Sequence, residues 1–166
     1  MKKVTILLAI VFLGTASFAA AKAAPAASSS QGVVGVSLNQ IPVLPGAAPS
    51  VRFGFGNWSL DAGGSLTNTA AGTSISIFGK GEIPISKIGS DVRTYWAPEL
   101  CLFSPAGGGG STTVISVYMG AEYMFASHLA LFADLTAISI ASAGGTTTWT
   151  IGASSPLVYT GGRLYF

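Results

Sequence analysis

Charged side chains are scarce in this sequence, at 8% of 166 residues, whereas an ordinary soluble domain carries about 25%. Cysteine and histidine occur once each, as Cys101 and His128. A lone cysteine permits no disulfide within the chain, and one residue of each type is too few for a metal site. The sequence therefore predicts no metal, no cofactor and a fold that is held together by other means.

Long apolar runs are also missing beyond residue 23. No uninterrupted stretch there has the roughly 20 apolar residues that a membrane-spanning helix needs. A chain that is so poor in charge and lacks such a helix suits three classes of protein. It is a membrane protein built from strands, a buried subunit or an aggregation-prone polypeptide.

The N-terminal end has the pattern of a secretory signal. Lys2 and Lys3 precede the apolar run Val4–Leu13, and small residues follow, with cleavage sites after Ala21 or Ala23. The apolar run is about half the length of a spanning helix, so a cleaved signal is favoured over a retained anchor.

Three segments follow from this pattern. We assign 1–23 to a signal peptide, 24–32, which is rich in Ala and Ser, to a flexible segment, and 33–166 to one folded domain. Beyond residue 23, five basic residues stand against six acidic ones, a net charge of −1 with His128 neutral. The basic isoelectric point thus comes from the signal, and the composition gives no support for nucleic-acid binding.

The folded domain alternates apolar and other residues with a period of two, which indicates β-strands with one apolar face. In the stretch 50–56, for example, Val51, Phe53 and Phe55 share one face and Arg52 lies on the other. The same alternation predicts eight strands, near residues 33–38, 50–56, 58–67, 73–85, 91–104, 112–126, 129–142 and 158–166. Most have about the length of one membrane crossing. We expect an all-β fold, an eight-stranded antiparallel up-and-down transmembrane β-barrel.

The predicted connections alternate in length. Tight turns are expected at 56–57, 87–90 and 127–128, and longer loops at 39–49, 67–72, 105–110 and 143–156. The tight turns and both termini then lie at one end, as in outer-membrane barrels with short periplasmic turns. A count of ten strands stays open, because 146–166 can hold two strands broken at Ser155–Pro156.

Two places depart from a simple alternation. Pro98 cannot donate a hydrogen bond to a neighbouring strand, so we expect a bulge there, which leaves the facing of Glu99 and Cys101 open. Ile138 and Ile140 fall on the charged face of their strand. We therefore expect the upper end of that strand to be out of phase or outside the membrane.

The charges of the domain occupy the face opposite the bulky apolar residues. We predict a network of charges inside the barrel, made of Arg52, Asp61, Lys80, Glu82, Arg93, Glu99, Glu122, Asp134 and Arg163. Four basic and five acidic residues suit a compensated network, since charges taken out of water must be paired. An eight-stranded barrel is just wide enough for its own side chains, so a filled interior is favoured over a pore lining.

Aromatic residues gather on the apolar face near the predicted short turns. Phe53, Phe55, Trp58, Tyr123, Phe125 and Phe166 form a predicted aromatic girdle at the lipid boundary. A terminal ring gains nothing when it frays in water. Phe166 is explained if the last strand ends at this boundary.

At "GAEYMFASHLALFADL" and "TGGRLYF" the chain resembles the small outer-membrane β-barrel superfamily, which includes OmpX-like proteins and the transmembrane domain of OmpA. The resemblance covers essentially everything after the signal. It implies that the C-terminal strand is read by the barrel-assembly machinery, through a terminal aromatic and apolar residues at alternate positions before it. Phe166, Leu164 and Val158 match that pattern, while Gly162 and Thr160 are weak substitutes.

Composition, strands and resemblance together predict a protein of the outer membrane of a Gram-negative bacterium. Its partners are membrane lipid and the assembly machinery, and the sequence identifies no extracellular partner. We expect a structural or surface-interaction role, such as membrane integrity or adhesion. The alternatives are a narrow porin-like channel for small solutes and a soluble periplasmic barrel that binds an apolar ligand, as lipocalins do.

An enzyme is the weakest alternative. His128 lies in a predicted periplasmic turn, whereas the acyl-modifying enzymes of the outer membrane use His and Ser at the extracellular side. A triad of His128 with Asp134 and a serine has no specific signal in the sequence. We predict that the protein is not an enzyme.

Overall fold

A computed structural model describes residues 32–40, 47–152 and 158–166 of the chain. In these ranges the fold is all-β, with nine antiparallel strands in one sheet. The predicted signal peptide and nearly all of the predicted flexible segment lie outside the described residues. None of the described residues forms a helix that is long and apolar enough to cross a membrane.

The strands follow one another along the chain with one short helix between them. They are β1 (Gly32–Gln40), β2 (Ala47–Phe55), β3 (Trp58–Thr69), β4 (Gly72–Ile88), β5 (Val92–Ser104), the 3₁₀-helix η1 (Ala106–Gly108), β6 (Thr112–Ala126), β7 (Leu129–Ala143), β8 (Thr146–Ile151) and β9 (Val158–Tyr165).

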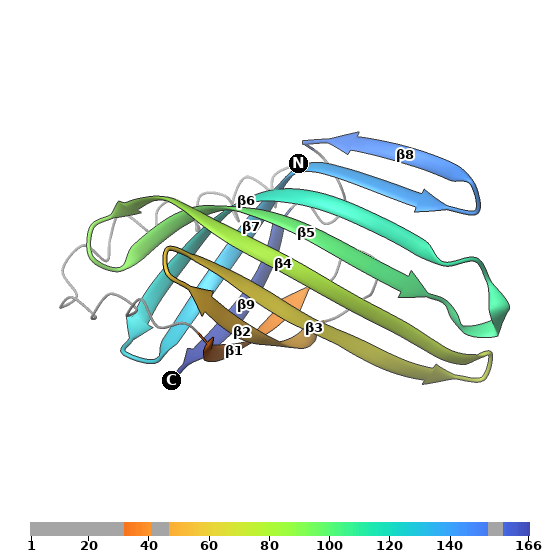
Figure 1. The fold of residues 1–166 in the computed structure, drawn as a ribbon, viewed down its shortest axis with the longest axis horizontal. Coiled ribbons are helices and arrows are strands. Elements are labelled where there is room, and N and C mark those ends of the chain that lie inside the picture. The colour runs from red at the N-terminus through yellow and green to blue at the C-terminus, as the bar shows by residue number, and fades with distance from the viewer. Residues whose placement is uncertain (1–31, 41–46, 153–157) are drawn as a thin grey trace, which may run out of the picture.

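Eight of the strands form a closed ring. Each strand from β1 to β7 pairs with the next, and β9 pairs with both β7 and β1, which closes the circle. The eight predicted strands correspond to these eight. The ninth, β8, pairs with the far end of β7 and stands outside the ring (Figure 1).

The two ends of the ring differ in their connections. The turns 56–57, 89–91 and 127–128 lie at one end together with the C-terminus (Figure 1). The first and the last are at the predicted positions, whereas the turn expected at 87–90 begins two residues later because β4 continues to Ile88. The backbone N–H of Tyr165 donates to the carbonyl oxygen of His128 over 2.8 Å, which ties the last strand to the turn between β6 and β7. We call this the short-turn end.

Two connections at the other end are tight turns where loops were predicted, whereas the loop expected at 105–110 is present at 105–111. The loop expected at 67–72 is wrong, because β3 and β4 continue to a two-residue turn at 70–71. The loop expected at 143–156 is also wrong, because it contains β8. Gly144 and Gly145 both have positive φ, at 55° and 82°, and two such residues make the tight hairpin turn that joins β7 to β8.

The described residues form nine strands, so the counts of eight and ten are both wrong, although 146–166 does hold two strands, as the alternative proposed. β8 and β9 pair with β7 one after the other: Ile151 lies opposite Ile138, and Val158 lies opposite Leu135. The break predicted at Ser155–Pro156 lies outside the described residues, in the gap 153–157.

The bulge predicted at Pro98 is absent. Pairing of β5 with β6 runs without a shift from Ala97 to Glu99, and the irregularity in β5 pairing lies elsewhere, between Pro84 and Ser86 of β4. Pro98 faces outward next to Gly81, where an added Cβ would still be 3.8 Å from the proline ring. That is ordinary contact, and the strand keeps its phase through the proline.

The strand pairing shows which way the residues left open by the sequence point. Glu99 and Cys101 point into the ring, where both are buried. In β7 an extra residue, Ala137, is inserted opposite the Val117–Tyr118 step of β6. This bulge reverses the phase and turns Ile138 outward, where 41% of it is exposed, so the predicted change of phase in this strand is confirmed.

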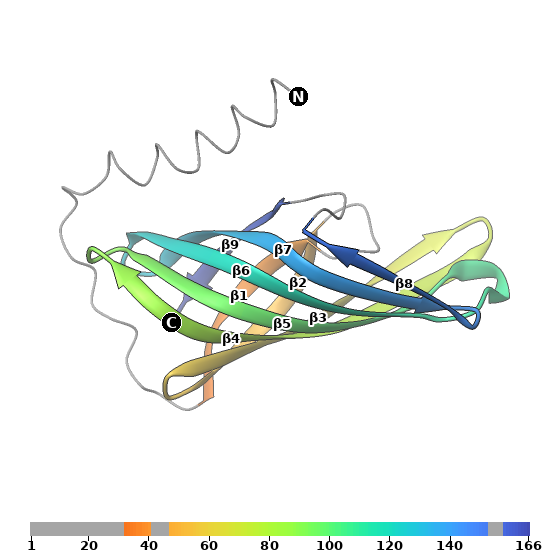
Figure 2. The same ribbon diagram turned by 90° about the horizontal axis from the view of Figure 1, so that it is seen from above.

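One wall of the ring is lower than the other. β2 makes its last pair with β3 at Ser50–Gly63, although β3 continues to Thr69. Beyond that pair, Ala48 of β2 turns inward and packs with Phe78 of β4. Strands β3 to β8 therefore project beyond the low wall as an open sheet (Figures 1 and 2).

The close fit of the interior predicts a strong effect at Gly120. A Cβ at this position would fall well inside contact distance of the Tyr95 ring and the Asp134 carboxylate. We expect Gly120→Ala to destabilise the fold by about 1–3 kcal/mol, the usual cost of overpacking. The measurement is the guanidinium midpoint followed by tryptophan fluorescence.

Gly79→Ala is the matched control, because its nearest heavy atom, on Leu60, would be 3.9 Å away. Equal midpoints for the two variants would mean that the interior is looser than described.

Candidate functional site in the ring interior

The nine charged residues predicted to point inward all do so. They come from seven strands, namely Arg52 (β2), Asp61 (β3), Lys80 and Glu82 (β4), Arg93 and Glu99 (β5), Glu122 (β6), Asp134 (β7) and Arg163 (β9). Eight of them are at most 5% exposed, and the Arg93 side chain is 25% exposed. The period of two places them on one face of their strands, and closure of the ring makes that face the inside.

Arg163 is the centre of the network. Its guanidinium forms ion pairs with Glu82 and with Glu122, and a longer one of 3.5 Å with Asp61. The four residues stand on four different strands, so the cluster spans the interior of the ring. The Arg163 guanidinium also lies over the Phe132 ring, with 4.0 Å from the guanidinium carbon to the ring centroid.

Two further arginines complete this cluster. Arg52 binds Asp61 at 3.0 Å and Glu82 at 2.6 Å, and Arg93 binds Glu82 at 3.1 Å and Glu122 at 3.2 Å. Three guanidinium groups thus share three carboxylates. The bonds are charge-assisted and partly bidentate, which is the geometry that offsets the desolvation of buried charges.

Lys80 and Asp134 form a second ion pair beside the arginine cluster. The Tyr95 hydroxyl donates to the other oxygen of Asp134 over 2.8 Å. The Lys80 ammonium lies 4.6 Å from the centroid of the Phe132 ring, which Arg163 also contacts. Aromatic rings therefore fill the space between the charges and leave them little contact with water.

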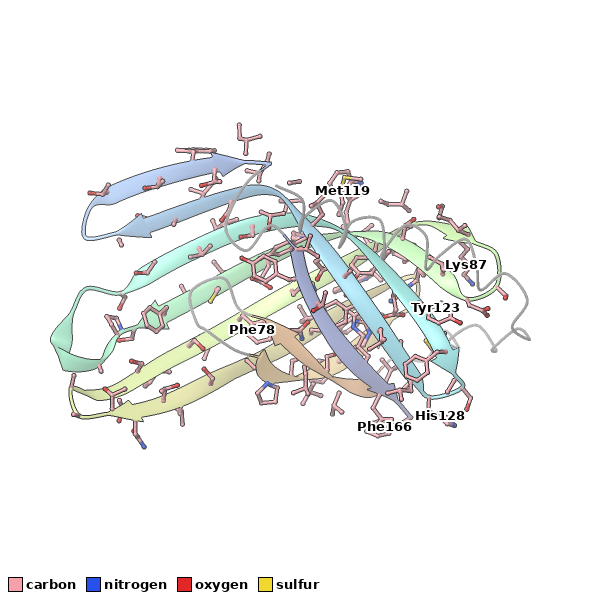
Figure 3. The ribbon with its side chains drawn as sticks, turned by 180° about the vertical axis from the view of Figure 1, so that it is seen from behind. Phe78, Lys87, Met119, Tyr123, His128 and Phe166 are labelled. Atoms are coloured by element: carbon pink, nitrogen blue, oxygen red, sulfur yellow. The ribbon has the colours of Figure 1, made fainter. Side chains whose placement is uncertain are left out.

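Glu99 differs from the other acids because the ion pairs of the described residues do not include it. It accepts a hydrogen bond of 3.1 Å from the Tyr118 hydroxyl, and the Tyr118 ring packs edge-on against Tyr159. Above this layer an apolar cap closes the interior, made of Ala48, Phe78, Cys101 and Val114. Figure 3 shows Phe78 inside the ring and Met119 on its outside.

The predicted girdle residues lie on the outer face, around the short-turn end. Phe55 and Trp58 stack across the turn with 4.4 Å between ring centroids. Phe125 and Phe166 are exposed, whereas Phe53 and Tyr123 are half-buried. Figure 3 shows Phe166 near His128 at this end. Of the predicted assembly residues, Leu164 and Phe166 are exposed on the outer face, and Val158 is half-buried at the opposite end of β9.

Sequence reasoning missed the aromatic side of the interior. Tyr165, beside the terminal Phe166, donates its hydroxyl to Glu122 over 2.8 Å. Tyr95, Tyr118 and Phe132 also point inward. The sequence did contain a signal for them. Each of these aromatic residues is an even number of positions away from a charged residue of its own strand, so the two lie on the same face.

The residues considered for catalysis are not brought together. His128 is exposed in a turn, whereas Asp134 is buried and held by Lys80 and Tyr95. Cys101 is free and buried in the apolar cap. In the described part of the chain no cluster of three or more His, Cys, Asp or Glu could hold a metal ion.

Comparison with known proteins adds no relative. No family model, no curated protein and no solved structure matches the chain.

Removal of Arg163 tests the network. In Arg163→Met, three buried carboxylates lose their shared cation, and we expect the stability to fall by about 3–5 kcal/mol. Lys87→Met removes an exposed cation and should leave the stability unchanged. Both are read as shifts of the denaturant midpoint, and a wild-type midpoint for Arg163→Met would contradict a supporting role of the network.

Proposed function

We propose that the ring is a β-barrel inserted in the outer membrane of a Gram-negative bacterium, with a structural or surface-interaction role. One observation carries the proposal: the polarity of a soluble protein is inverted. Nearly all the charge is buried inside, and large apolar side chains are exposed outside. Ile77, Ile83, Leu100, Leu131 and Trp149 are each between 47% and 66% exposed, unlike the side chains of a water-facing surface.

The height of the apolar outer band supports this reading. On β6 the band extends from Phe125 to Ile115, which are ten residues apart. A strand that rises about 3.3 Å per residue and is tilted by about 40° gains about 25 Å over this stretch. That is the apolar height of outer-membrane barrels. Ile115 pairs with Ile140, and Ile140 with Trp149, so an interfacial aromatic stands at the upper boundary as well.

The alternatives fit the interior less well. A lipocalin-like carrier needs an apolar interior and a polar outside, the reverse of what is found here. A narrow channel needs a continuous path, and the buried arginine cluster with the apolar cap of Ala48, Phe78, Cys101 and Val114 above it speaks against one. A structural or surface role requires no path, and the projecting strands β3 to β8 offer surface for contacts.

Export and assembly belong to the same proposal. The predicted signal 1–23 would direct the chain across the inner membrane. The C-terminal strand, with Leu164 and Phe166 on its outer face, would be recognised by the barrel-assembly machinery, as the resemblance implies.

The proposal predicts a heat-modifiable protein in outer-membrane fractions. The precursor would be expressed in a Gram-negative host, and unboiled and boiled samples compared on SDS gels. A ring closed by its full set of inter-strand hydrogen bonds resists SDS until it is heated, so we expect a mobility shift on boiling. A soluble periplasmic band without a shift would contradict membrane insertion.

A charge on the outer face gives a sharper test. Met119 lies between Phe125 and Ile115 on β6 and is 47% exposed. In a bilayer, Met119→Arg should cost about 2–4 kcal/mol, whereas on a water-facing surface it should cost almost nothing. The measurement is the urea midpoint of refolding into phospholipid vesicles.

Asn68→Arg, exposed near the projecting tip of β3, is the matched control and should behave as wild type. Equal midpoints for the two arginine variants would speak against a lipid-facing band.

A further inference from the structure

The projecting sheet has two free edges that border the low wall. β8 pairs with β7 on one side, and no described strand pairs with its other side. β3 makes its last pair with β2 at Gly63, so the segment Gly64–Thr69 has no described partner on that side. The two edges face each other across the upper end of β9, β1 and β2 (Figure 1).

The backbone groups of β8 that face the edge can be identified. The N–H of Gly152 donates to the carbonyl oxygen of Ala137 in β7. Because hydrogen bonding alternates along an antiparallel strand, every second residue before Gly152 also bonds β7. The N–H and C=O groups of Thr147, Trp149 and Ile151 therefore point away from β7, toward the open edge.

The same argument applies to β3. Thr69 and Gly72 flank the two-residue turn to β4 and form the first pair of that hairpin, in which both hydrogen bonds are exchanged. Odd-numbered residues of β3 thus bond β4. The N–H and C=O groups of Gly64, Leu66 and Asn68 point to the open edge.

Neither edge carries the usual protection against pairing. Natural edge strands are blunted by charged residues, proline or bulges, but segments 63–69 and 146–152 contain no charge and no proline. Leu66, Trp149 and Ile151 are among the most exposed apolar residues described, at 73%, 66% and 76%. Two unprotected, uncharged edges of this kind are suited to β-strand pairing with another chain.

We propose that β8 of one copy pairs with the upper edge of β3 of a second copy in the same membrane. This inference rests on the proposed function, because it takes both copies to stand upright in one bilayer. β8 runs toward the short-turn end and β3 runs away from it. Two upright copies therefore present these edges to each other antiparallel, with the same tilt and the same face outward.

The geometry disfavours a symmetric pairing of β8 with β8. Antiparallel strands are related by a twofold axis perpendicular to the sheet, which would turn one copy upside down in the membrane. The head-to-tail contact has no such conflict. It leaves a free β3 at one end and a free β8 at the other, so it forms either a closed ring of copies or a chain.

The outer surface below the two edges carries an apolar groove that suits contact with a second copy. A groove of about 710 Å³ opens on the outer face of β1, β2 and β9, lined by Val36, Leu38, Val51 and Leu164 among others. It is predominantly apolar. The groove extends to Gly63, where the free edge of β3 begins, so an apolar wall of a second copy paired there would cover it.

Disulfide trapping tests the proposal. One register pairs Trp149 with Leu66, Thr147 with Asn68 and Ile151 with Gly64, and hydrogen-bonded partners have Cα atoms about 5.5 Å apart, within disulfide range. Leu66→Cys and Trp149→Cys would be co-expressed as separate chains and oxidised in intact outer membranes. We expect a dimer band from the mixture and none from either variant alone. The double variant should give a ladder of larger species.

Leu102→Cys mixed with Trp149→Cys is the matched control, since Leu102 is exposed on the outer face but lies on β5, away from both edges. It should give no dimer. Thr147→Pro should abolish the ladder of the double variant, because it removes an edge-facing N–H while β7 keeps its partners.

Several results would overturn the proposal. A dimer from Trp149→Cys alone would point to symmetric pairing. A shifted monomer from the double variant would mean that the two edges pair within one copy, although three strand spacings, about 15 Å, separate them. No cross-link, in a protein that still shifts on boiling, would reject this contact and leave membrane insertion standing. Loss of the boiling shift from wild type would instead count against the proposed function.

Discussion

The structure depends on the neutralisation of charge inside a narrow ring of strands. Arg163, Glu82 and Glu122 are almost fully buried, and an isolated ion in such a place would cost several kcal/mol even after relaxation. Their stability therefore requires all partners at once, with hydrogen bonds from neighbours such as Tyr165. The domain has few charged residues, and nearly all of them lie in the interior, where they can be paired. The outer face is then free to be apolar.

The filled interior also shapes the rest of the fold. Above the charges, Ala48 of β2 points inward and packs with Phe78 and Cys101, which places an apolar layer over the charged one. β2 makes no described pair with β3 beyond Gly63, and β9 makes none with β7 beyond Leu135, so no ring strand stands beside the upper part of β3 or beside the free side of β8. The low wall and the two free edges therefore arise from the same early end of these pairings.

The sequence alone was sufficient for the ring strands and for the side to which each charge points, because both follow from a period of two. It failed where one residue changes the geometry. The bulge at Ala137 cannot be read from alternation without the partner strand, and neither can the unshifted register at Pro98. The Gly144–Gly145 turn had a recognisable signal, yet its surroundings resembled a long polar loop. The ion pairs themselves join strands far apart in the sequence and could only be expected as a group.

The pairing pattern has a consequence for the order of assembly. Arg163 stands on the last strand, and its partners stand on β3, β4 and β6, so the carboxylates of three earlier strands must be in place before the arginine has somewhere to go. Until β9 docks between β7 and β1, Glu82 and Glu122 lack their main cation and the sheet has open edges. Docking of β9 supplies the hydrogen bonds and the neutralising charge in the same step. Ring closure and charge compensation are therefore coupled, and a partly closed sheet is disfavoured on both counts.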